Sequence, residues 1–367
     1  MQILLIEPYY GGSHRAWVDG YCEHSQHHIE TLTMPAQFWK WRLQGGAVSI
    51  ARMIDERALQ PDFLLVSDMV DLSTLRALTA HSTARTPTAL YFHETQLTYP
   101  QNARQSHGWR YGFINYISAL SADAVYFNSQ YHHDVFFKTL PNMLKHFGDY
   151  NELQTVEIIR EKSTVLPLGL ALKRFDAHRP AHPSRNERPL IVWNHRWEAD
   201  KNPTAFVEAL YRLDEDGLDF EVAIIGQNVR QSRTEFDECR VRLAHRIRHF
   251  GYLPDFASYA DLLWRADYVV STAHQEFFGG AIAEALYCGC VPILPDRLNY
   301  PALLPPDQRD ACLYRGDNPR YCLMAHLRGE HDVDSDALRA HISRYDWQAI
   351  APQYDATFAA YAPASPN

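Results

Sequence analysis

The sequence predicts an α/β protein made of two doubly wound domains, each a parallel sheet with helices on both faces. Short apolar runs of strand length alternate with helical segments, which is typical of strands buried on both sides. This alternation stops once near the middle of the chain and then begins again. A chain of 367 residues is long for one hydrophobic core and suits two domains of ordinary size.

The first domain is expected to span residues 1–172. Strand-like apolar runs occur at Gln2–Ile6, His28–Leu32, Phe63–Ser67, Thr88–Phe92, Ala124–Asn128 and Thr164–Leu168. Helical segments lie between them, and a strand that is followed by a helix pairs in parallel with the next strand. The first half of the chain therefore predicts one parallel sheet.

Residues 173–189 are expected to be a linker, because they combine three prolines and five Lys or Arg residues with no periodicity. The second domain is expected to span residues 190–345. Its predicted strands are Leu190–Asn194, Phe220–Ile225, Tyr268–Ser271, Val291–Leu294 and, more weakly, Ala311–Tyr314, with helices that include Pro203–Asp214 and Gln231–Arg248. Residues 346–367 predict a last amphipathic helix, with Ile350, Tyr354, Phe358 and Tyr361 on one face.

The composition excludes several classes of protein. Hydrophobic residues make up 46% and charged residues 22%, as in soluble globular proteins. Glu7 interrupts the first apolar run, so no signal peptide is predicted, and no run approaches membrane-spanning length. The net charge of −9 argues against a strongly basic nucleic-acid binder but allows a local basic patch. The six cysteines show no zinc spacing, so reduced thiols in a cytoplasmic enzyme are expected.

Residues 271–295 carry the strongest chemical signal. A buried strand ends in a loop that holds Glu276, a glycine pair opens a short helix, and Glu284 lies one turn inside it. Gly279 and Gly280 would bring a diphosphate close to the unpaired N–H groups of the helix N-terminus. The two carboxylates would accept hydrogen bonds from sugar and ribose hydroxyls. This stretch therefore predicts a sugar-nucleotide site, whereas the alternative is a helix cap with Glu284 as a solvated surface residue.

Two cations follow the first strand of the second domain. Arg196 comes directly after it, and Lys201 precedes a helix that has Pro203 at its first position. They are expected to stabilise the charge that develops on a departing diphosphate. The alternative is that both cations pair with neighbouring acids on a solvated loop.

Candidate binding or catalytic residues also follow strands of the first domain. Gly11, Gly12 and Ser13 form a turn that opens a helix and could place amides near a phosphate, although tight strand-to-helix turns use glycine anyway. The turn lacks the Gly-x-Gly-x-x-Gly spacing, so a dehydrogenase is disfavoured. His93 follows the fourth strand, at the edge where ligands bind in doubly wound sheets.

The stretch Phe38 to Arg42 alternates aromatic and basic residues. Such side chains suit the wall of an acceptor site, because aromatic rings stack on unpaired bases and cations contact phosphate. The alternative is an amphipathic turn that buries Trp39 or Trp41 in the core. The expected acceptor-binding residues are His14, Trp39, Lys40, Trp41, Arg42, His93, Gln96, Arg104 and Arg110.

The second half resembles retaining glycosyltransferases of the two-domain GT-B fold, family four. The resemblance rests on Glu276-x7-Glu284, on the flanking Phe278-Gly279-Gly280 and on Arg196-x4-Lys201. It implies two domains that face a central cleft, with the C-terminal helix crossing back to the first domain. His93, Glu276, Arg196 and Lys201 would then be catalytic. The implied donor-binding residues are Gly11, Gly12, Ser13, Arg196, Lys201, Gly226, Tyr252, Leu253, Glu276, Phe278, Gly279, Gly280 and Glu284.

A closer resemblance covers nearly the whole chain. The segments 6–14, 34–42, 92–100, 112–116 and 125–129 are similar to the tRNA-queuosine mannosyltransferase family. The resemblance implies transfer of mannose from GDP-mannose to the cyclopentene diol of queuosine in tRNA-Asp, without a metal or other cofactor.

Two alternatives to this interpretation remain open. One is another GT-B enzyme with a different nucleotide sugar and a glycan, lipid or small-molecule acceptor. Another is a catalytically silent sugar-nucleotide or RNA-binding module, which the presence of both acids and both phosphate-binding cations disfavours. The oligomeric state is not indicated by the sequence.

Overall fold

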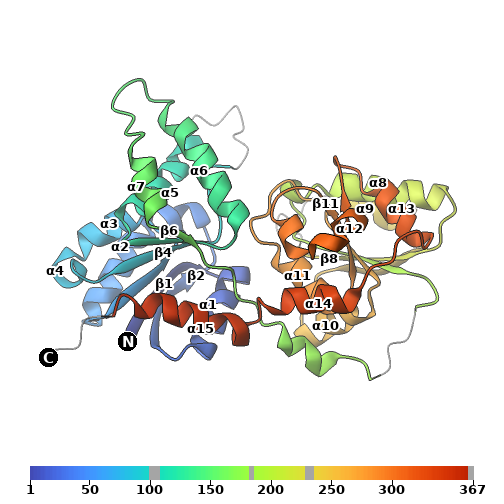
Figure 1. The fold of residues 1–367 in the computed structure, drawn as a ribbon, viewed down its shortest axis with the longest axis horizontal. Helices are drawn as coiled ribbons and strands as arrows, with labels where there is room; N and C mark the ends of the chain where they lie inside the picture. Colours follow the sequence, from blue (N-terminus) through green and yellow to red (C-terminus); the bar gives the residue numbers. More distant parts are fainter. Residues whose placement is uncertain (99–107, 182–185, 228–234, 363–367) are drawn as a thin grey trace. The chain divides into compact units, whose positions relative to one another are not determined.

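The computed structural model describes residues 1–98, 108–181, 186–227 and 235–362 (Figure 1). The chain forms two compact units. Unit 1 comprises Met1–Leu170 together with Trp347–Asn367, and unit 2 comprises Ala171–Asp346. Each unit contains, within the described residues, one six-stranded sheet in which every strand pair is parallel. The α/β prediction with two doubly wound sheets is therefore confirmed.

The sheet of unit 1 changes direction of winding beside its first strand. Its strands are β1 (Gln2–Tyr10), β2 (His28–Pro35), β3 (Phe63–Ser67), β4 (Thr88–Phe92), β5 (Ala124–Phe127) and β6 (Ser163–Val165). Their order is β2-β1-β3-β4-β5-β6, so the order reverses between β1 and β3. Ligands of doubly wound sheets bind outside the carboxyl ends of the strands at such a switch point.

Helices cover both faces of this sheet. They are α1 (Gly12–His24), α2 (Trp39–Glu56), α3 (Leu72–Leu78), α4 (Ala80–Thr83), α5 (Gly108–Ser121), α6 (Gln130–Leu144), α7 (Thr155–Glu161) and α15 (Trp347–Ala359). Alternate strand residues such as Leu4, Leu64 and Phe92 share one hydrophobic cluster with α2, α3, α5, α6 and α7. The intervening residues point to the opposite face, because successive side chains of a strand alternate.

The last helix, α15, packs on that opposite face beside α1 (Figure 1). The ring of Phe358 lies 5.3 Å from Phe63 and 5.5 Å from Tyr126, measured between centroids. The hydroxyl of Tyr354 donates to Pro167 O, and the hydroxyl of Tyr21 on α1 donates to Asp355. The C-terminal helix thus completes the core of unit 1, although more than 170 residues of unit 2 separate it from β6 in the sequence.

Unit 2 has the strand order of dinucleotide-binding domains. Its strands are β7 (Leu190–Asn194), β8 (Glu221–Ile225), β9 (Ile247–Gly251), β10 (Tyr268–Val270), β11 (Val291–Pro295) and β12 (Leu313–Tyr314). The order β12-β11-β10-β7-β8-β9 places the switch point between β7 and β10. The loops that carry Arg196 and Glu276 follow these two strands, so the strand order alone brings them together.

Helices and 3₁₀ turns connect the strands of unit 2. The α-helices are α8 (Pro203–Glu215), α9 (Glu235–Arg242), α10 (Phe256–Arg265), α11 (Gly280–Tyr287), α12 (Arg309–Cys312), α13 (Arg320–Leu327) and α14 (Ser335–Ser343). The 3₁₀ turns are η1 (Lys173–His178), η2 (Ala199–Lys201), η3 (Tyr300–Leu303) and η4 (Pro306–Gln308). Pro203 occupies the first position of α8, as the sequence predicts.

Three sequence predictions differ from the structure. The helix predicted over 231–248 is wrong at its C-terminal end, because α9 stops at Arg242 and β9 pairs with β8 from Ile247 onward. The strand predicted over 311–314 is reduced to β12, because residues 309–312 are helical. Residues 173–178 of the predicted linker form η1, whose Phe175 is buried against Phe256.

Two further observations concern the chain as a whole. In the described residues we find no helix with the length and hydrophobicity needed to span a membrane. All six cysteines are free thiols, and four of them are buried.

Candidate functional site

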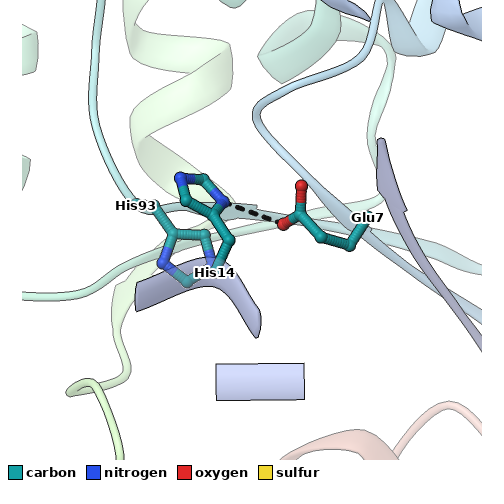
Figure 2. A group of neighbouring side chains, drawn as sticks. All are labelled: Glu7, His14 and His93. Carbon is teal, nitrogen blue, oxygen red and sulfur yellow. Dashed lines mark hydrogen bonds and ion pairs between the residues drawn. The ribbon is translucent and has the colours of Figure 1, made fainter. Parts of the chain in front are cut away.

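Unit 1 holds a cluster of buried titratable groups at the carboxyl ends of β1, β3 and β4. Figure 2 shows three of them, Glu7, His14 and His93, with Glu7 and His14 joined by a hydrogen bond. Glu7 Oε2 lies 2.9 Å from His14 Nδ1, and Glu7 Oε1 accepts the Tyr9 backbone N–H at 2.7 Å. The imidazole rings of His14 and His93 lie 4.3 Å apart, measured between centroids.

The two imidazoles differ in protonation. Burial alone would lower the pKa of His14, but the Glu7 carboxylate outweighs it and raises this pKa to about 9. His14 is therefore an imidazolium at neutral pH. Burial holds the pKa of His93 well below its usual value, and the neighbouring His14 cation lowers it further, so His93 is neutral.

The backbone of His93 is fixed from both sides. Asp68 accepts the His93 N–H at 2.8 Å, and the side-chain amide of Asn128 donates to His93 O at 2.9 Å. Within the described part of the chain, His93 Nε2 is buried and has no hydrogen-bond partner. A buried polar atom without a hydrogen-bond partner is uncommon in folded proteins, which makes His93 a candidate functional residue.

The same cluster bears on metal binding. One ligand atom from each of Glu7, His14 and His93 lies within 4.8 Å of the others, so the three side chains could surround an ion. However, both Glu7 oxygens already accept hydrogen bonds, and an imidazolium has no lone pair to offer. In this arrangement the cluster is a carboxylate–imidazolium ion pair of Glu7 and His14 beside the neutral imidazole of His93.

The turn that opens α1 lies beside this cluster. Gly12 has a φ of +54°, and a Cβ atom there would meet nothing within 4 Å, so the first turn of α1 is open. Gly11 has a different role, because a Cβ atom there would lie 2.5 Å from Ala36 Cβ on the segment after β2. Ser13 belongs to the exposed first turn of α1.

The predicted acceptor residues differ in exposure. Trp39 packs its ring 5.1 Å from Tyr111 and is half-buried, whereas Trp41 is exposed. Lys40 and Arg110 are exposed, and Arg42 Nε donates to Pro35 O. Gln96 donates through its side-chain amide to Glu94. Arg104 lies outside the described residues.

Unit 2 brings together Lys201 and Glu276 at its own switch point. Lys201 Nζ donates to Gln275 O at 2.6 Å and lies 3.4 Å from Glu276 Oε2 and 3.2 Å from Asp200 Oδ2. Although burial opposes the charged form of Lys201, the two carboxylates raise its pKa. Burial likewise works against ionised Glu276, but Lys201 lowers the pKa of that carboxyl. Both groups are therefore charged at neutral pH.

Arg196 and His195 lie next to this pair. The Arg196 guanidinium is exposed and lies 3.4 Å from Glu198 Oε2. Burial, together with the cation of Lys201, lowers the pKa of His195 to about 3, so this histidine is neutral. Gly226 is required here because a Cβ atom would lie 1.9 Å from His195 O.

The N-terminus of α11 differs in detail from the sequence prediction. Gly279 has a φ of +96°, and its N–H donates to Glu276 Oε1 at 3.2 Å rather than pointing to an open site. Gly280 begins the helix, so its N–H and those of the next residues belong to the first turn, where helices lack internal partners. Phe278 is buried and Asn299 donates to its carbonyl.

Glu284, one turn into α11, is held by a partner that the sequence prediction missed. The hydroxyl of Tyr259 donates to Glu284 Oε2 at 2.8 Å, while burial raises the pKa of Glu284. Tyr252 is exposed and Leu253 half-buried on the loop that follows β9.

Three residues of these clusters were not assigned a role from the sequence. Glu7 and Asp68 are acids at the carboxyl end of a buried strand, which is a signal that the sequence already contained. Tyr259 had no such signal, because its contact with Glu284 joins two helices that are adjacent only in the folded unit.

The chain is similar to known glycosyltransferases along its length. Residues 2–170 match the family described as tRNA-queuosine alpha-mannosyltransferase N-terminal, and residues 174–313 match glycosyl transferases group 1. The chain is 34% identical to the tRNA-queuosine alpha-mannosyltransferase of Drosophila melanogaster, over 96% of this chain and 95% of that protein.

Two further similarities are more remote. A GDP-mannose-dependent alpha-(1-6)-phosphatidylinositol dimannoside mannosyltransferase of Mycobacterium tuberculosis is 29% identical over 132 residues, 35% of this chain and 34% of that protein. The structure of HepE from Anabaena with UDP-glucose superposes with a TM-score of 0.66 at 15% identity, over 98% of this chain and all of that one, which shows the fold alone. The chain thus belongs to the tRNA-queuosine alpha-mannosyltransferase family, and it is a glycosyltransferase of the GT-B fold.

Proposed function

We propose that this enzyme transfers mannose from GDP-mannose to the cyclopentene diol of queuosine in tRNA-Asp. The observation that carries the proposal is the 34% identity to a tRNA-queuosine alpha-mannosyltransferase across both units. The Mycobacterium relative, which is named as GDP-mannose-dependent, supports the choice of donor. A tRNA acceptor also favours a cytoplasmic enzyme.

The proposal assigns the donor to unit 2. Lys201 and Arg196 stabilise the charge that builds up on the leaving diphosphate, because fixed cations interact most strongly with a developing anion. The first-turn amides of α11, beginning at Gly280, bind the same phosphates. Glu276, which Lys201 keeps ionised, accepts hydrogen bonds from sugar hydroxyls, and Glu284 accepts them from ribose.

In the proposal, the remaining contacts with the donor are made by glycines and by residues in loops and turns. Gly226 allows the backbone after β8 to lie close to the carbonyl of His195. Tyr252 and Leu253 flank the nucleobase. Phe278 shapes the sugar side of the site, and Gly11, Gly12 and Ser13 offer amides to the phosphates from unit 1.

The proposal assigns the acceptor to unit 1. The bond between the anomeric carbon and the diphosphate oxygen breaks, the acceptor oxygen forms the new bond on the same face, and the leaving phosphate takes the acceptor proton. His93, which is neutral and whose Nε2 has no hydrogen-bond partner among the described residues, orients the reacting groups. No metal is required by this sequence of steps, because Arg196, Lys201 and helix amides supply the positive charge.

The test uses purified enzyme, GDP-mannose and tRNA that carries queuosine. We expect nucleoside mass spectrometry to show queuosine heavier by one hexose residue, and no product with tRNA that carries guanosine at the wobble position. UDP-glucose and UDP-galactose serve as competing donors. Transfer from a uridine nucleotide, or no transfer to any queuosine-containing tRNA, would contradict the proposal.

A further inference from the structure

The first turn of α2 exposes two aromatic side chains on a unit whose other large aromatic side chains are mostly packed. Phe38, which precedes α2, is 77% exposed and Trp41 is 61% exposed. The N–H of Trp41 donates to Phe38 O at 2.7 Å, so the two residues belong to one helical turn. An exposed aromatic pair of this kind marks an interaction surface.

The orientation of Trp41 is fixed by the helix itself. A Cβ atom on Gly45, one turn further along α2, would lie 2.7 Å from Trp41 Cζ2, so the indole lies directly over that glycine. Any other residue at position 45 would push the ring away. One part of the indole therefore rests on the helix while the rest faces outward, as in a preformed stacking surface.

Phe38 is held in an unfavourable backbone conformation. Its φ of +50° and ψ of +53° are left-handed, which is rare for a bulky residue. A glycine would adopt this conformation without strain, and the exposed ring returns little packing. Strain combined with exposure indicates that the ring itself is needed there.

The same turn is positively charged in an acidic chain. Lys40 and Arg42 flank Trp41, and the first turn of α2 contains no acidic residue. Gln44, three residues beyond Trp41, lines a cavity of about 600 Å³ whose other lining residues include Asp71, Arg110, Phe113 and Phe147. Since α2 follows β2, this turn lies at the carboxyl edge of the sheet, the edge that also carries Glu7 and His93.

We propose that Phe38 and Trp41 stack on unpaired nucleobases next to the queuosine of the acceptor, while Lys40 and Arg42 bind the phosphates between them. This inference rests on the proposed function, because it takes a tRNA anticodon loop as the acceptor. Single-stranded RNA offers unstacked bases to aromatic rings and phosphates to cations, so a surface that carries both kinds of side chain suits it. A glycan would require the rings but not the cations.

The experiment measures binding of a fluorescent anticodon stem-loop RNA to the full chain by anisotropy, with no donor present. We expect Trp41→Ala to weaken binding at least about fivefold, the lower end of what one stacked base contributes. Trp41→Phe should restore most of the affinity. Tyr321→Ala is the control, because Tyr321 is 66% exposed but lies on unit 2. A blunt RNA duplex of equal length should be bound equally by wild type and Trp41→Ala.

Phe38→Gly separates recognition from folding. Glycine relieves the left-handed strain, so this variant should melt at or above the wild-type temperature while it binds the stem-loop more weakly. The inference is overturned if wild type does not bind the stem-loop, if both variants bind it like wild type, or if Trp41→Ala weakens the duplex equally. Binding through Trp41 without mannosyl transfer would instead refute the proposed function and leave this inference standing.

Discussion

The clustered residues Glu7, His14 and His93 of unit 1 differ in protonation state. Glu7 is fully buried, so it does not touch substrate, and it acts through His14, whose imidazolium it stabilises. Burial keeps His93 neutral, and the His14 cation lowers the pKa of His93 further. The titratable groups that influence His14 are Glu7, Asp68 and Glu94, all of which favour its protonated form.

Replacing Glu7 by Gln should move the pH dependence of the reaction. Burial opposes the imidazolium, and without the carboxylate the largest contribution that favours it is lost, so the alkaline limb of kcat/KM should shift from about pH 9 to a lower pH. The pH profile, with the His14 ring titrated by NMR, is the measurement. A lower rate with an unmoved profile would mean that Glu7 is only structural.

The free energy of unfolding should also depend on the protonation of His14. Between pH 6.5 and about 9 the folded state keeps the His14 proton and the unfolded chain releases it, so the free energy of unfolding should fall as pH rises through this window. Urea denaturation of wild type and Glu7→Gln at several pH values measures this slope. The variant should lack it, and an equal slope in both proteins would contradict the assignment.

Replacing Arg196 and replacing Lys201 by alanine should have different effects on turnover and on the melting temperature. Arg196→Ala should lower turnover about a hundredfold, as loss of one charge-stabilising donor does, with unchanged melting because the side chain is exposed. Lys201→Ala should lose activity and also melt earlier, since it leaves the carboxylates of Glu276 and Asp200 without their shared ammonium. Kinetics and thermal denaturation test both. Full activity of Arg196→Ala would remove Arg196 from the proposed donor site.

At the scale of elements, α15 is joined to unit 1 by close contact at two glycines. A Cβ atom on Gly20 of α1 would lie 1.9 Å from Trp347 Nε1, and one on Gly169 would lie 2.5 Å from the same indole. Trp347 is fully buried, so its ring cannot move aside without disturbing the core.

Gly20→Ala should therefore destabilise unit 1 by about 1–3 kcal/mol, the usual cost of overpacking a core. Gly148→Ala is the matched control, because a Cβ atom there meets nothing within 4 Å. Chemical denaturation followed by tryptophan fluorescence measures both variants. Equal stability of the two would show that α15 is loosely attached.

For the whole molecule, the expectation of metal-independent chemistry can be tested directly. EDTA should leave the rate of mannosyl transfer unchanged, because the cations assigned to the diphosphate are protein groups and Glu7 already pairs with protonated His14. The measurement is initial rate after dialysis against the chelator. A loss that Zn²⁺ or Mn²⁺ reverses would point to the cluster of Glu7, His14 and His93 instead.

The positions of most strands along the chain were predictable because buried parallel strands leave a local trace, a continuous apolar run between two helices. The short strand β9 left none, since Ile247–Gly251 alternates with Arg and His and follows an arginine-rich helix without a break. The position of the candidate site residues at strand ends, such as Glu276, Lys201 and His93, was predictable for the same reason: the end of a strand is visible in the sequence.

The sequence by itself determined that the chain has two parallel sheets, which loops end at their carboxyl edges and which charged residues those loops carry. Only the tertiary structure decided which of two histidines holds a proton, that the Gly279 amide is taken by Glu276, and that Trp39 is packed while Trp41 is exposed. The physical reason is that strand and helix patterns arise from neighbours along the chain. Protonation, amide pairing and ring exposure depend instead on burial and on partners that folding brings together.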